Sequence, residues 1–221
     1  MDNKIFNSKI YLPSKREEWS LFAGLQPVIK TVLDYVGAVF GIITLLFLYP
    51  VVAFLIKIDS RGPVFYVQKR CGLNGKEFGM YKFRTMFTNA DELKNNLKNE
   101  AEGSVFKIKN DPRITRVGKF LRRTSLDEFP QIFNVLKGEM SLVGPRPLAY
   151  EEMSGCEEWR ALRLKKKPGI TGLWQVKGRG SKSFNDWIQY DKEYVLNYSI
   201  LLDMKIIFLT IGAIIKGNGA Y

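Results

Sequence analysis

The sequence predicts an α+β protein that is mostly helical and carries a membrane-inserted helix near its N-terminus. Three observations support this: an uncharged stretch from Tyr35 to Ile56, two short β-rich segments between residues 63 and 86, and amphipathic or aromatic-rich segments from residue 148 onward. A chain of 221 residues has enough material for one domain with its own core. We expect an N-terminal extension of unknown role at 1–27, a membrane-inserted helix at 28–58, and a domain at 59–221 that ends in an interfacial helix.

The composition excludes several classes of site. The chain contains no histidine, which excludes a Ser-His-Asp triad, a Cys-His pair and histidine-ligated zinc. Its two cysteines, Cys71 and Cys156, are too few and too far apart for a thiolate metal site, and they predict ordinary thiols in a reducing cytoplasm. The net charge of +12 predicts an acidic partner, for which nucleic acid, anionic lipid and phosphorylated substrates all qualify.

The uncharged stretch is long enough to cross a bilayer. It holds 22 residues, and a helix of that length covers roughly 33 Å, about the thickness of the hydrocarbon core. Pro50 lies inside it and predicts a kink, because proline removes a backbone donor and clashes with the preceding turn. Basic residues flank both ends, so the positive-inside bias chooses neither side as external. A re-entrant helix that bends at Pro50 and a spanning helix both remain open.

A β-hairpin is expected next. Residues 63–68 are rich in β-formers, residues 71–75 supply turn residues, and residues 78–86 supply a returning strand. On that second strand Lys82 and Arg84 share one face. Two like charges on one face are compatible with a solvent-exposed strand edge or with a phosphate-binding site.

The remaining elements are predicted from composition. Residues 88–101 indicate a polar helix, residues 148–164 an amphipathic helix, and residues 184–199 an aromatic-rich packing segment. Residues 206–215 form a ten-residue uncharged run, which is too short to span a bilayer. We favour an interfacial helix there over internal packing.

Two adjacent carboxylates, Asp127 and Glu128, lie between two strongly basic stretches, residues 107–123 and 163–182. Charge balancing alone accounts for that pattern, and so does a site that needs acids for a metal and bases for phosphate. Ser125 and Glu128 also match a capping box, in which case the acids only start a helix. Pro130 would lie too deep in such a helix.

Arginines near the acids favour the phosphate interpretation. Arg122 and Arg123 precede the pair, and the turn Gly144-Pro145-Arg146-Pro147 follows it and fixes an arginine on stiff backbone. Neighbouring helical residues diverge by about 100°, so the two acids cannot both point at one atom. One nucleophile and one metal ligand is a sensible division of roles.

The motifs, taken in order, resemble a known family. They are Tyr81-Lys-Phe-Arg-Thr-Met86, the segment from Thr124 to Gly138, Ser141-Leu-Val-Gly-Pro-Arg-Pro147 and Lys167-Pro-Gly-Ile-Thr-Gly172. Together they look like the bacterial sugar transferases, the monotopic polyprenyl-phosphate phosphoglycosyl transferases, from about Lys30 to Lys216. Ordered matches of this kind are highly specific.

The resemblance implies transfer of a sugar 1-phosphate from a UDP-sugar to undecaprenyl (polyprenyl) phosphate, with release of UMP, as the first membrane step in assembling exopolysaccharide, capsule, O-antigen or another glycoconjugate. It implies Asp127 as the nucleophile that forms a covalent phosphosugar intermediate, and Glu128 as a ligand of Mg²⁺. It further implies a bacterial inner membrane location, with the catalytic domain on the cytoplasmic face and membrane lipid as a partner, and it leaves no role for nucleic acid.

The resemblance also assigns substrate-binding residues. Arg122 matches the arginine for polyprenyl phosphate, and Arg123 and Lys82 are grouped with it. Arg84 matches a basic strand residue of the active site. Arg146 and Arg179 match arginines near the nucleotide-sugar phosphates, and Gln175 and Gly178 lie in the same loop.

This sequence departs from the family pattern at the helix break. The family often carries Ser-Pro where its re-entrant helix breaks, and this chain has Tyr49-Pro50. A serine hydroxyl can satisfy a backbone carbonyl freed at the break, whereas tyrosine folds back less easily. The chain also lacks the multi-helix N-terminal extension of larger relatives, which predicts a short or truncated form.

Two other functions compete with this one. A basic membrane adaptor would bind anionic lipid or nucleic acid with steep salt dependence and without need of the acids. A glycosyl transferase that moves sugar without phosphate would release UDP rather than UMP. Neither needs the ordered Asp-Glu and Gly-Pro-Arg-Pro motifs.

Overall fold

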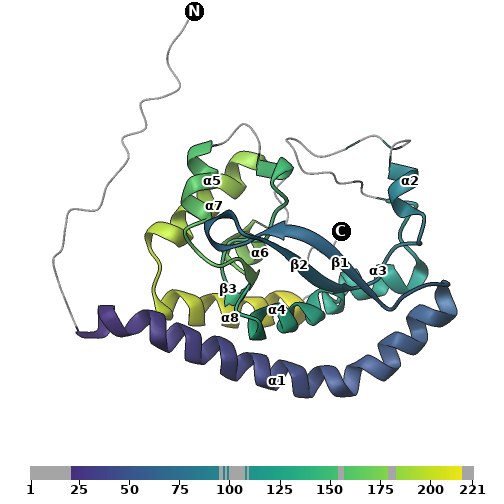
Figure 1. Ribbon diagram of the computed structural model, residues 1–221, viewed down its shortest axis with the longest axis horizontal. Coiled ribbons are helices and arrows are strands. Elements are labelled where there is room, and N and C mark those ends of the chain that lie inside the picture. Colours follow the sequence, from purple (N-terminus) through teal and green to yellow (C-terminus); the bar gives the residue numbers. More distant parts are fainter. Residues whose placement is uncertain are drawn as a thin grey trace, which may run out of the picture.

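The computed structural model describes residues 21–94, 110–153, 157–178 and 183–215, together with Leu97, Asn99 and Ile108. The described part is mostly helical with small sheets, as predicted (Figure 1). Its α-helices are α1 (Leu21–Asp59), α2 (Ala90–Lys94), α3 (Arg116–Arg123), α4 (Ile132–Leu136), α5 (Glu157–Arg163), α6 (Leu173–Lys177), α7 (Phe184–Leu196) and α8 (Ile200–Ile215). The strands are β1 (Phe65–Cys71), β2 (Glu77–Phe83), β3 (Ser141–Val143) and β4 (Gly169–Thr171), and short 3₁₀ segments are η1 (Leu73–Gly75), η2 (Leu126–Gln131) and η3 (Glu151–Met153).

Helix α1 is a continuous helix that underlies the rest of the molecule. It begins before the predicted boundary at residue 28 and contains both Pro27 and Pro50. Figure 1 shows it as a bowed ribbon that runs beneath the domain, with its C-terminal end rising toward α3. Pro50 therefore lies within a curved helix and does not divide it into two helices.

Only one face of α1 is buried. The buried residues recur at helical spacing and lie against α3, α4, β3 and α8: Asp34, Ala38, Leu45, Val52 and Ile56. Two glycines allow the close approach. A Cβ at Gly37 would lie 2.4 Å from Leu142 Cδ1, and one at Gly41 would lie 2.5 Å from Ile132 Cγ1. The domain is thus packed along most of the length of α1.

Tyr49, the residue that departs from the family pattern, packs against the hairpin. Its ring stacks on Phe65 at 5.5 Å, and Phe65 stacks on Phe83 at 5.4 Å. Phe65 and Phe83 are also directly paired across the antiparallel strands β1 and β2. The residue before Pro50 therefore ties the curved part of α1 to both strands of the predicted hairpin.

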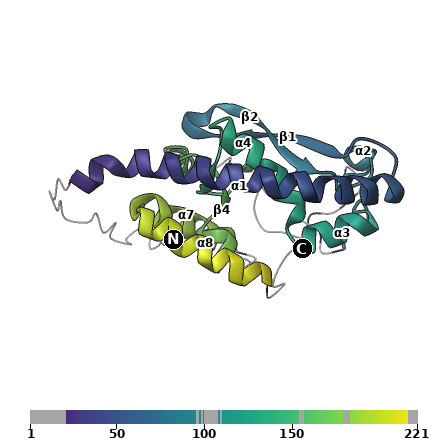
Figure 2. The same cartoon turned by 90° about the horizontal axis from the view of Figure 1, so that it is seen from below.

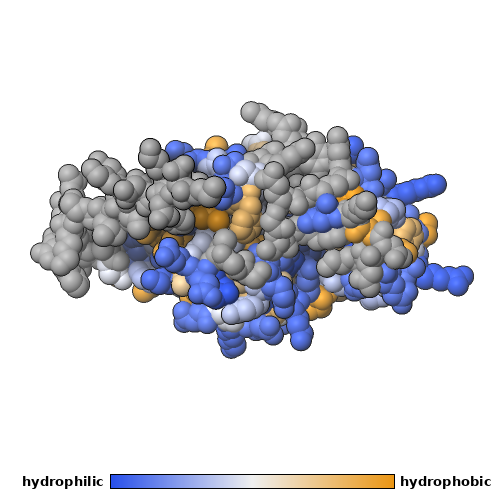
Figure 3. Space-filling view, turned by 90° about the horizontal axis from the view of Figure 1, so that it is seen from above, coloured by the Kyte–Doolittle hydropathy of each residue, from blue (hydrophilic) through white to orange (hydrophobic). Residues whose placement is uncertain are grey.

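The underside of the molecule combines α1 and α8, which lie side by side in Figure 2. The two helices expose large apolar side chains on this side, including Val32, Phe40, Phe47, Phe54, Leu201, Phe208 and Ile211. Within the described residues, Gly24–Asp59 is the helix that is long and apolar enough to cross a membrane, and 17% of its most apolar window is buried. So low a buried share indicates membrane association rather than a core helix. The opposite side carries many hydrophilic residues (Figure 3).

Two predicted helices differ from the structure. In the polar segment 88–101 the assigned helix is α2, at 90–94, and much of the rest of that segment lies outside the described residues. The prediction of one helix over 148–164 is wrong, because residues 148–150 are not helical and α5 covers 157–163. The Leu148 carbonyl instead accepts a hydrogen bond from the Cys71 amide at 2.9 Å. Backbone pairing with β1 therefore replaces the expected first turn.

The parallel pair of β3 and β4 was not predicted. Ser141 pairs with Gly169 and Val143 pairs with Thr171. The two three-residue strands therefore lie together, β3 directly before the Gly144–Pro147 turn and β4 directly after Pro168.

Asn134 joins α4 to the hairpin through two hydrogen bonds. Its Oδ1 accepts from the Tyr81 amide at 3.0 Å, and its Nδ2 donates to the Gly79 carbonyl at 2.8 Å. These bonds place the acidic segment against β2.

Candidate active site

The acidic segment does not form the capping box. Ser125 adopts a left-handed conformation with φ of 58°, and its side chain makes no capping hydrogen bond. The residues after it form η2, a 3₁₀ turn, and the α-helix begins only at Ile132. Pro130 is accommodated because it lies in the 3₁₀ turn and not inside α4. Asp127 and Glu128 are therefore presented by a tight turn.

Glu128 forms the centre of a charged cluster. Its Oε1 lies 3.3 Å from Lys82 Nζ and 3.0 Å from Arg146 Nη2, and the side chain is 18% exposed. Burial alone would raise the pKa of Glu128, but the charges of Arg146 and Lys82 and their hydrogen bonds lower it to about 2. Glu128 is thus an ionised carboxylate at neutral pH. Strand β2, η2 and the turn after β3 converge on it.

Asp127 lies in a different electrostatic environment from its neighbour. The residue is 8% exposed. Burial and the adjacent charge of Glu128 raise the pKa of Asp127 to about 6, against the opposing effects of Lys82, Arg122 and Arg146. At neutral pH it is mostly ionised yet poorly solvated. That is the state in which a carboxylate is a good nucleophile.

Arg122 and Arg123, at the end of α3, differ in placement. Arg122 Nε donates to Thr85 Oγ1 at 2.9 Å. Burial lowers the pKa of Arg122, and the charge of Asp127 opposes that shift. Arg122 and Asp127 therefore interact electrostatically. Arg123 is exposed. The turn of a helix has separated two arginines that are neighbours in sequence.

Arg84 is buried behind the hairpin. Its guanidinium donates through Nη2 to the Ser60 carbonyl at 2.7 Å and through Nη1 to the Arg61 carbonyl. Gly62, with φ of 127°, makes room for it, because a Cβ there would lie 2.3 Å from Arg84 Nη1. These bonds hold the connection between α1 and β1. A contact with substrate remains a prediction for Arg84.

The loop with Gln175, Gly178 and Arg179 is only partly described. Gln175 lies on α6, and both polar atoms of its amide are buried without a hydrogen-bond partner among the described residues. Gly178 packs on Trp174, since a Cβ there would lie 2.1 Å from the indole ring. Arg179 lies outside the described residues. No described contact joins Gln175 to the acidic pair.

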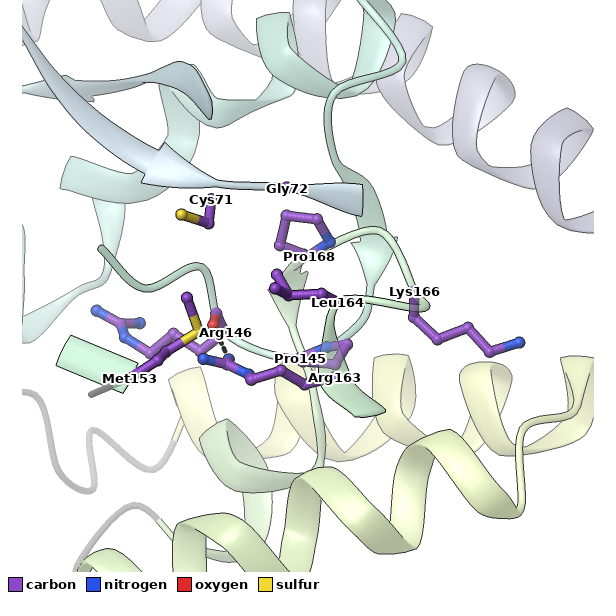
Figure 4. A pocket seen from close by; sticks show the side chains of 9 residues that line it. All are labelled: Cys71, Gly72, Pro145, Arg146, Met153, Arg163, Leu164, Lys166 and Pro168. Carbon is purple, nitrogen blue, oxygen red and sulfur yellow. Dashed lines mark hydrogen bonds between the residues drawn. The ribbon is translucent and has the colours of Figure 1, made fainter. Parts of the chain in front are cut away.

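Sequence reasoning missed residues that line the site. A depression beside Glu128 is lined by Arg70, Met80, Lys82, Gln131, Arg146, Pro147, Gly169 and Ile170. Arg70 comes from β1 and pairs with Glu152, whose carboxylate also accepts from the Ala149 amide at 2.8 Å. Arg70 lies between the predicted strand at 63–68 and the predicted turn at 71–75. The available signal was its place two residues after Gln68, on the same face of a longer strand. A second depression lies behind the Pro145–Arg146 backbone (Figure 4).

The donor set at the site limits which metal it suits. Among the described residues there is no cluster of three or more acidic, cysteine or histidine side chains. Mg²⁺ is usually held by one or two carboxylates together with substrate phosphates, and Glu128 offers one such carboxylate. Both ion pairs of Glu128 end on Oε1.

Comparison with known proteins agrees with this geometry. A family profile described as Bacterial sugar transferase matches residues 25–217. The chain belongs to this family. The match covers most of α1, the hairpin, the acidic segment and α8, so the long apolar helix and the charged cluster are parts of one family unit.

Three relatives of this sugar transferase illustrate the range. It is 46% identical, over 72% of its length, to the undecaprenyl-phosphate galactose phosphotransferase of Salmonella typhimurium, and covers 35% of that protein. It is 42% identical, over 88% of its length, to the UDP-glucose:undecaprenyl-phosphate glucose-1-phosphate transferase of Xanthomonas campestris pv. campestris, and covers 40% of it. It is 35% identical, over 97% of its length, to the exopolysaccharide production protein ExoY of Rhizobium meliloti, and covers 96% of it. The chain thus spans about two fifths of several curated relatives and nearly the whole of another.

Proposed function

We propose that this sugar transferase moves a sugar 1-phosphate from a UDP-sugar to undecaprenyl phosphate and so begins assembly of a surface polysaccharide or glycoconjugate. The observation that carries the proposal is the unequal acid pair. Glu128 is held ionised by two cations, while its neighbour Asp127 is buried and has its pKa raised to about 6. The names of the Salmonella and Xanthomonas relatives support this reaction class. They name different sugars, so the sugar is left open.

In the first step we assign Asp127 as the nucleophile. One of its carboxylate oxygens attacks the sugar-bearing phosphorus, a new P–O bond forms, and the P–O bond to the UMP leaving group breaks. Covalent catalysis of this kind divides one difficult displacement into two easier ones. The burial of Asp127 favours attack because it strips water from the carboxylate.

In the second step an oxygen of undecaprenyl phosphate attacks the same phosphorus. The new P–O bond forms as the bond to Asp127 breaks, which regenerates the carboxylate and yields the lipid diphosphate sugar. Arg122, whose Nε donates to Thr85, and the exposed Arg123 are suited to meet the lipid phosphate. Both steps bring together highly anionic groups, and Lys82 and Arg146 offset that charge.

Magnesium fits this site as a bound partner of the diphosphate. Glu128, with Asp127 beside it, would hold the ion together with substrate oxygens. When bound, Mg²⁺ neutralises the negative charge that develops on the phosphates. The residues of the chain orient the donor and supply the nucleophile.

We also propose that α1 enters and leaves the membrane by one face. The domain contacts α1 near its N-terminal part, where Lys30 Nζ donates to the Val143 carbonyl at 3.0 Å, and at its C-terminal end, where Asp59 accepts from the Val117 amide at 2.8 Å. A helix spanning perpendicular to the bilayer would carry these polar contacts into hydrocarbon. A cytoplasmic-face location on the inner membrane follows from the cytoplasmic supply of UDP-sugars.

Substitution of the acids tests the reaction. We expect Asp127→Asn to abolish transfer from a UDP-sugar to undecaprenyl phosphate, because an amide cannot form the intermediate. We expect Glu128→Gln to retain a reduced rate, lowered about 10²-fold or more, with a weaker dependence on Mg²⁺. Radiolabelled transfer into lipid extract is the measurement, with a panel of UDP-sugars.

The following outcomes distinguish the proposed reaction from its alternatives. Trapping the enzyme with donor alone and digesting it should reveal a phosphosugar adduct on the peptide that contains Asp127. Robust transfer by Asp127→Asn would remove the nucleophile assignment. Release of UDP rather than UMP would replace the proposed reaction by a simple glycosyl transfer, and salt-sensitive lipid binding without any transfer would favour the adaptor.

A further inference from the structure

The backbone of the Pro145-Arg146-Pro147 turn is fixed from outside the turn. Gly169 donates its amide to the Pro145 carbonyl at 2.9 Å, and Arg163 Nη2 donates to the Arg146 carbonyl. Figure 4 shows the Arg163 side chain beneath the turn, with its head group directed at Arg146. Arg163 comes from the last turn of α5 and belongs to no motif identified in the sequence.

Arg163 is itself held by a buried group of side chains. Its Nε lies 3.1 Å from Asp191 Oδ2, and its guanidinium lies 4.7 Å above the Trp159 ring. The Trp159 indole donates to the same Asp191 oxygen at 3.0 Å. The exposed fractions of Arg163, Asp191 and Trp159 are 4%, 3% and 2%. The three residues therefore form a closed arrangement between α5 and α7.

Stability alone does not explain the burial of the Arg163–Asp191 ion pair. Removing two charges from water costs free energy that the pair only partly recovers, and apolar replacements of similar volume are often as stable. What an apolar side chain cannot do is donate to the Arg146 carbonyl. That hydrogen bond connects the ion pair to the turn that presents Arg146.

The Arg146 carbonyl governs where the Arg146 guanidinium lies. Arg146 precedes a proline and follows another, so its backbone is restricted to extended conformations. Fixing its carbonyl then fixes the direction in which the side chain leaves the backbone, and its Nη2 lies 3.0 Å from Glu128 Oε1. A displacement of about 1 Å at such a group can lower a rate by about 10²-fold.

We propose that Arg163 and Asp191 are positioning residues for sugar-phosphate transfer. They hold the Arg146 turn so that its guanidinium meets Glu128 and the diphosphate of the donor. This inference rests on the proposed function. It assigns the geometry of the donor site to residues of α5 and α7, which are remote in sequence from the acids.

A double-mutant cycle tests the proposal. We expect Arg163→Gln to lower kcat/KM for the UDP-sugar by about tenfold to a hundredfold, mainly through KM, with a smaller effect on KM for undecaprenyl phosphate. Because Arg163 acts through Arg146, adding Arg163→Gln to Arg146→Gln should lower kcat/KM by no more than about threefold further. Arg163→Lys, which keeps the charge and one donor, should recover part of the loss.

Two further variants separate the effect of losing the ion pair from that of any change in helix α7. Asp191→Asn should reproduce the direction of the Arg163→Gln effect. Glu193→Gln, on the same helix and paired with Lys177 at an exposed surface, should leave kcat/KM unchanged. The proposal would be overturned if the losses in kcat/KM from Arg163→Gln and Arg146→Gln multiplied in full in the double variant. It would also be overturned if kcat/KM of Arg163→Gln were within about twofold of wild type.

A second readout does not need activity. Hydrogen exchange should show faster exchange of the Gly169 and Cys71 amides in Arg163→Gln, since these amides bond to Pro145 and Leu148 on the two sides of the turn. Peptides from α3 and α4 should keep their protection. Unchanged exchange of these amides in Arg163→Gln would overturn the positioning role, whatever the activity of the enzyme. Absence of sugar-phosphate transfer by wild type would instead disprove the proposed function.

Discussion

At the residue scale, two adjacent carboxylates have been given opposite properties by their neighbours. Glu128 is paired with Lys82 and Arg146, so its pKa falls to about 2. Asp127 is buried beside that negative charge, so its pKa rises to about 6. Pairs of titratable groups with pKa values driven apart in this way are typical of divided catalytic roles. The sequence predicted the division, and only the packing of β2 and the Arg146 turn determines which acid receives which environment.

The coupling between the acids predicts a shift in pH dependence. Attack by Asp127 needs the ionised carboxyl, so the rate of adduct formation should fall as pH decreases through about 6. Because the Glu128 charge raises the pKa of Asp127, Glu128→Gln should move this acid limb to lower pH. Single-turnover adduct formation, followed across pH at fixed Mg²⁺ concentration, measures it.

Lys82→Gln provides the control of opposite sign. The Lys82 charge lowers the pKa of Asp127, so its removal should move the acid limb to higher pH. If both substitutions shifted the limb in the same direction, the electrostatic account of the pair would be wrong.

At the element scale, α1 is held to the domain by close packing that small residues permit. Gly41 lies against Ile132, which belongs to the helix that directly follows the acidic turn. The position of α1 is therefore linked through α4 to the segment that carries Asp127 and Glu128. Tyr49 adds a second attachment through its stack on Phe65.

Enlarging Gly41 should weaken this attachment. We expect Gly41→Leu to lower the free energy of unfolding by about 1–3 kcal/mol, because the new side chain overlaps Ile132 and the core must shift. Thermal unfolding in detergent micelles is the measurement, with transfer activity recorded in parallel.

Gly24 offers a matched control in the same helix. A Cβ there meets nothing within 4 Å and leucine favours a helix more than glycine does, so Gly24→Leu should not lower the unfolding temperature. Equal losses from both variants would mean that helix glycines in general, rather than the contact with α4, determine the effect.

At the scale of the whole molecule, apolar and polar surfaces are divided between two sides. Helices α1 and α8, which lie side by side in Figure 2, expose large apolar side chains, and the charged cluster around Glu128 lies in the domain that packs on α1. This arrangement suits a reaction between a soluble nucleotide and a lipid phosphate. The domain contacts α1 toward both ends, which is the basis for placing both ends on one side of the membrane.

Accessibility labelling tests that topology. In a background with Cys71 and Cys156 replaced by alanine, Gly24→Cys and Arg61→Cys place single thiols at exposed positions near the two ends of α1. We expect a membrane-impermeant maleimide to label both from the cytoplasmic side in oriented vesicles, because both ends contact the same polar domain. Labelling from opposite sides would make α1 a spanning helix.

The sequence by itself determined the family and the classes of element. The lack of histidine, the acid pair between basic stretches, and the uncharged run are local in the chain, so composition and motif order were enough to predict a membrane-associated sugar transferase. The prediction of one long helix at 148–164 was wrong, because the local pattern competed with a longer-range contact. The capping box at Ser125, which Pro130 already argued against, does not form. A left-handed Ser125 starts a 3₁₀ turn, and Leu148 bonds to β1.

Only the tertiary structure decided how these groups act together. Arg84 lies within the same motif as Lys82, yet its guanidinium bonds to the chain after α1 while Lys82 meets Glu128. Arg163 and Asp191 carry no motif, yet they lie behind the turn that presents Arg146. Distances between segments far apart in the chain are set by how helices and strands pack, and no local pattern of residues contains that information.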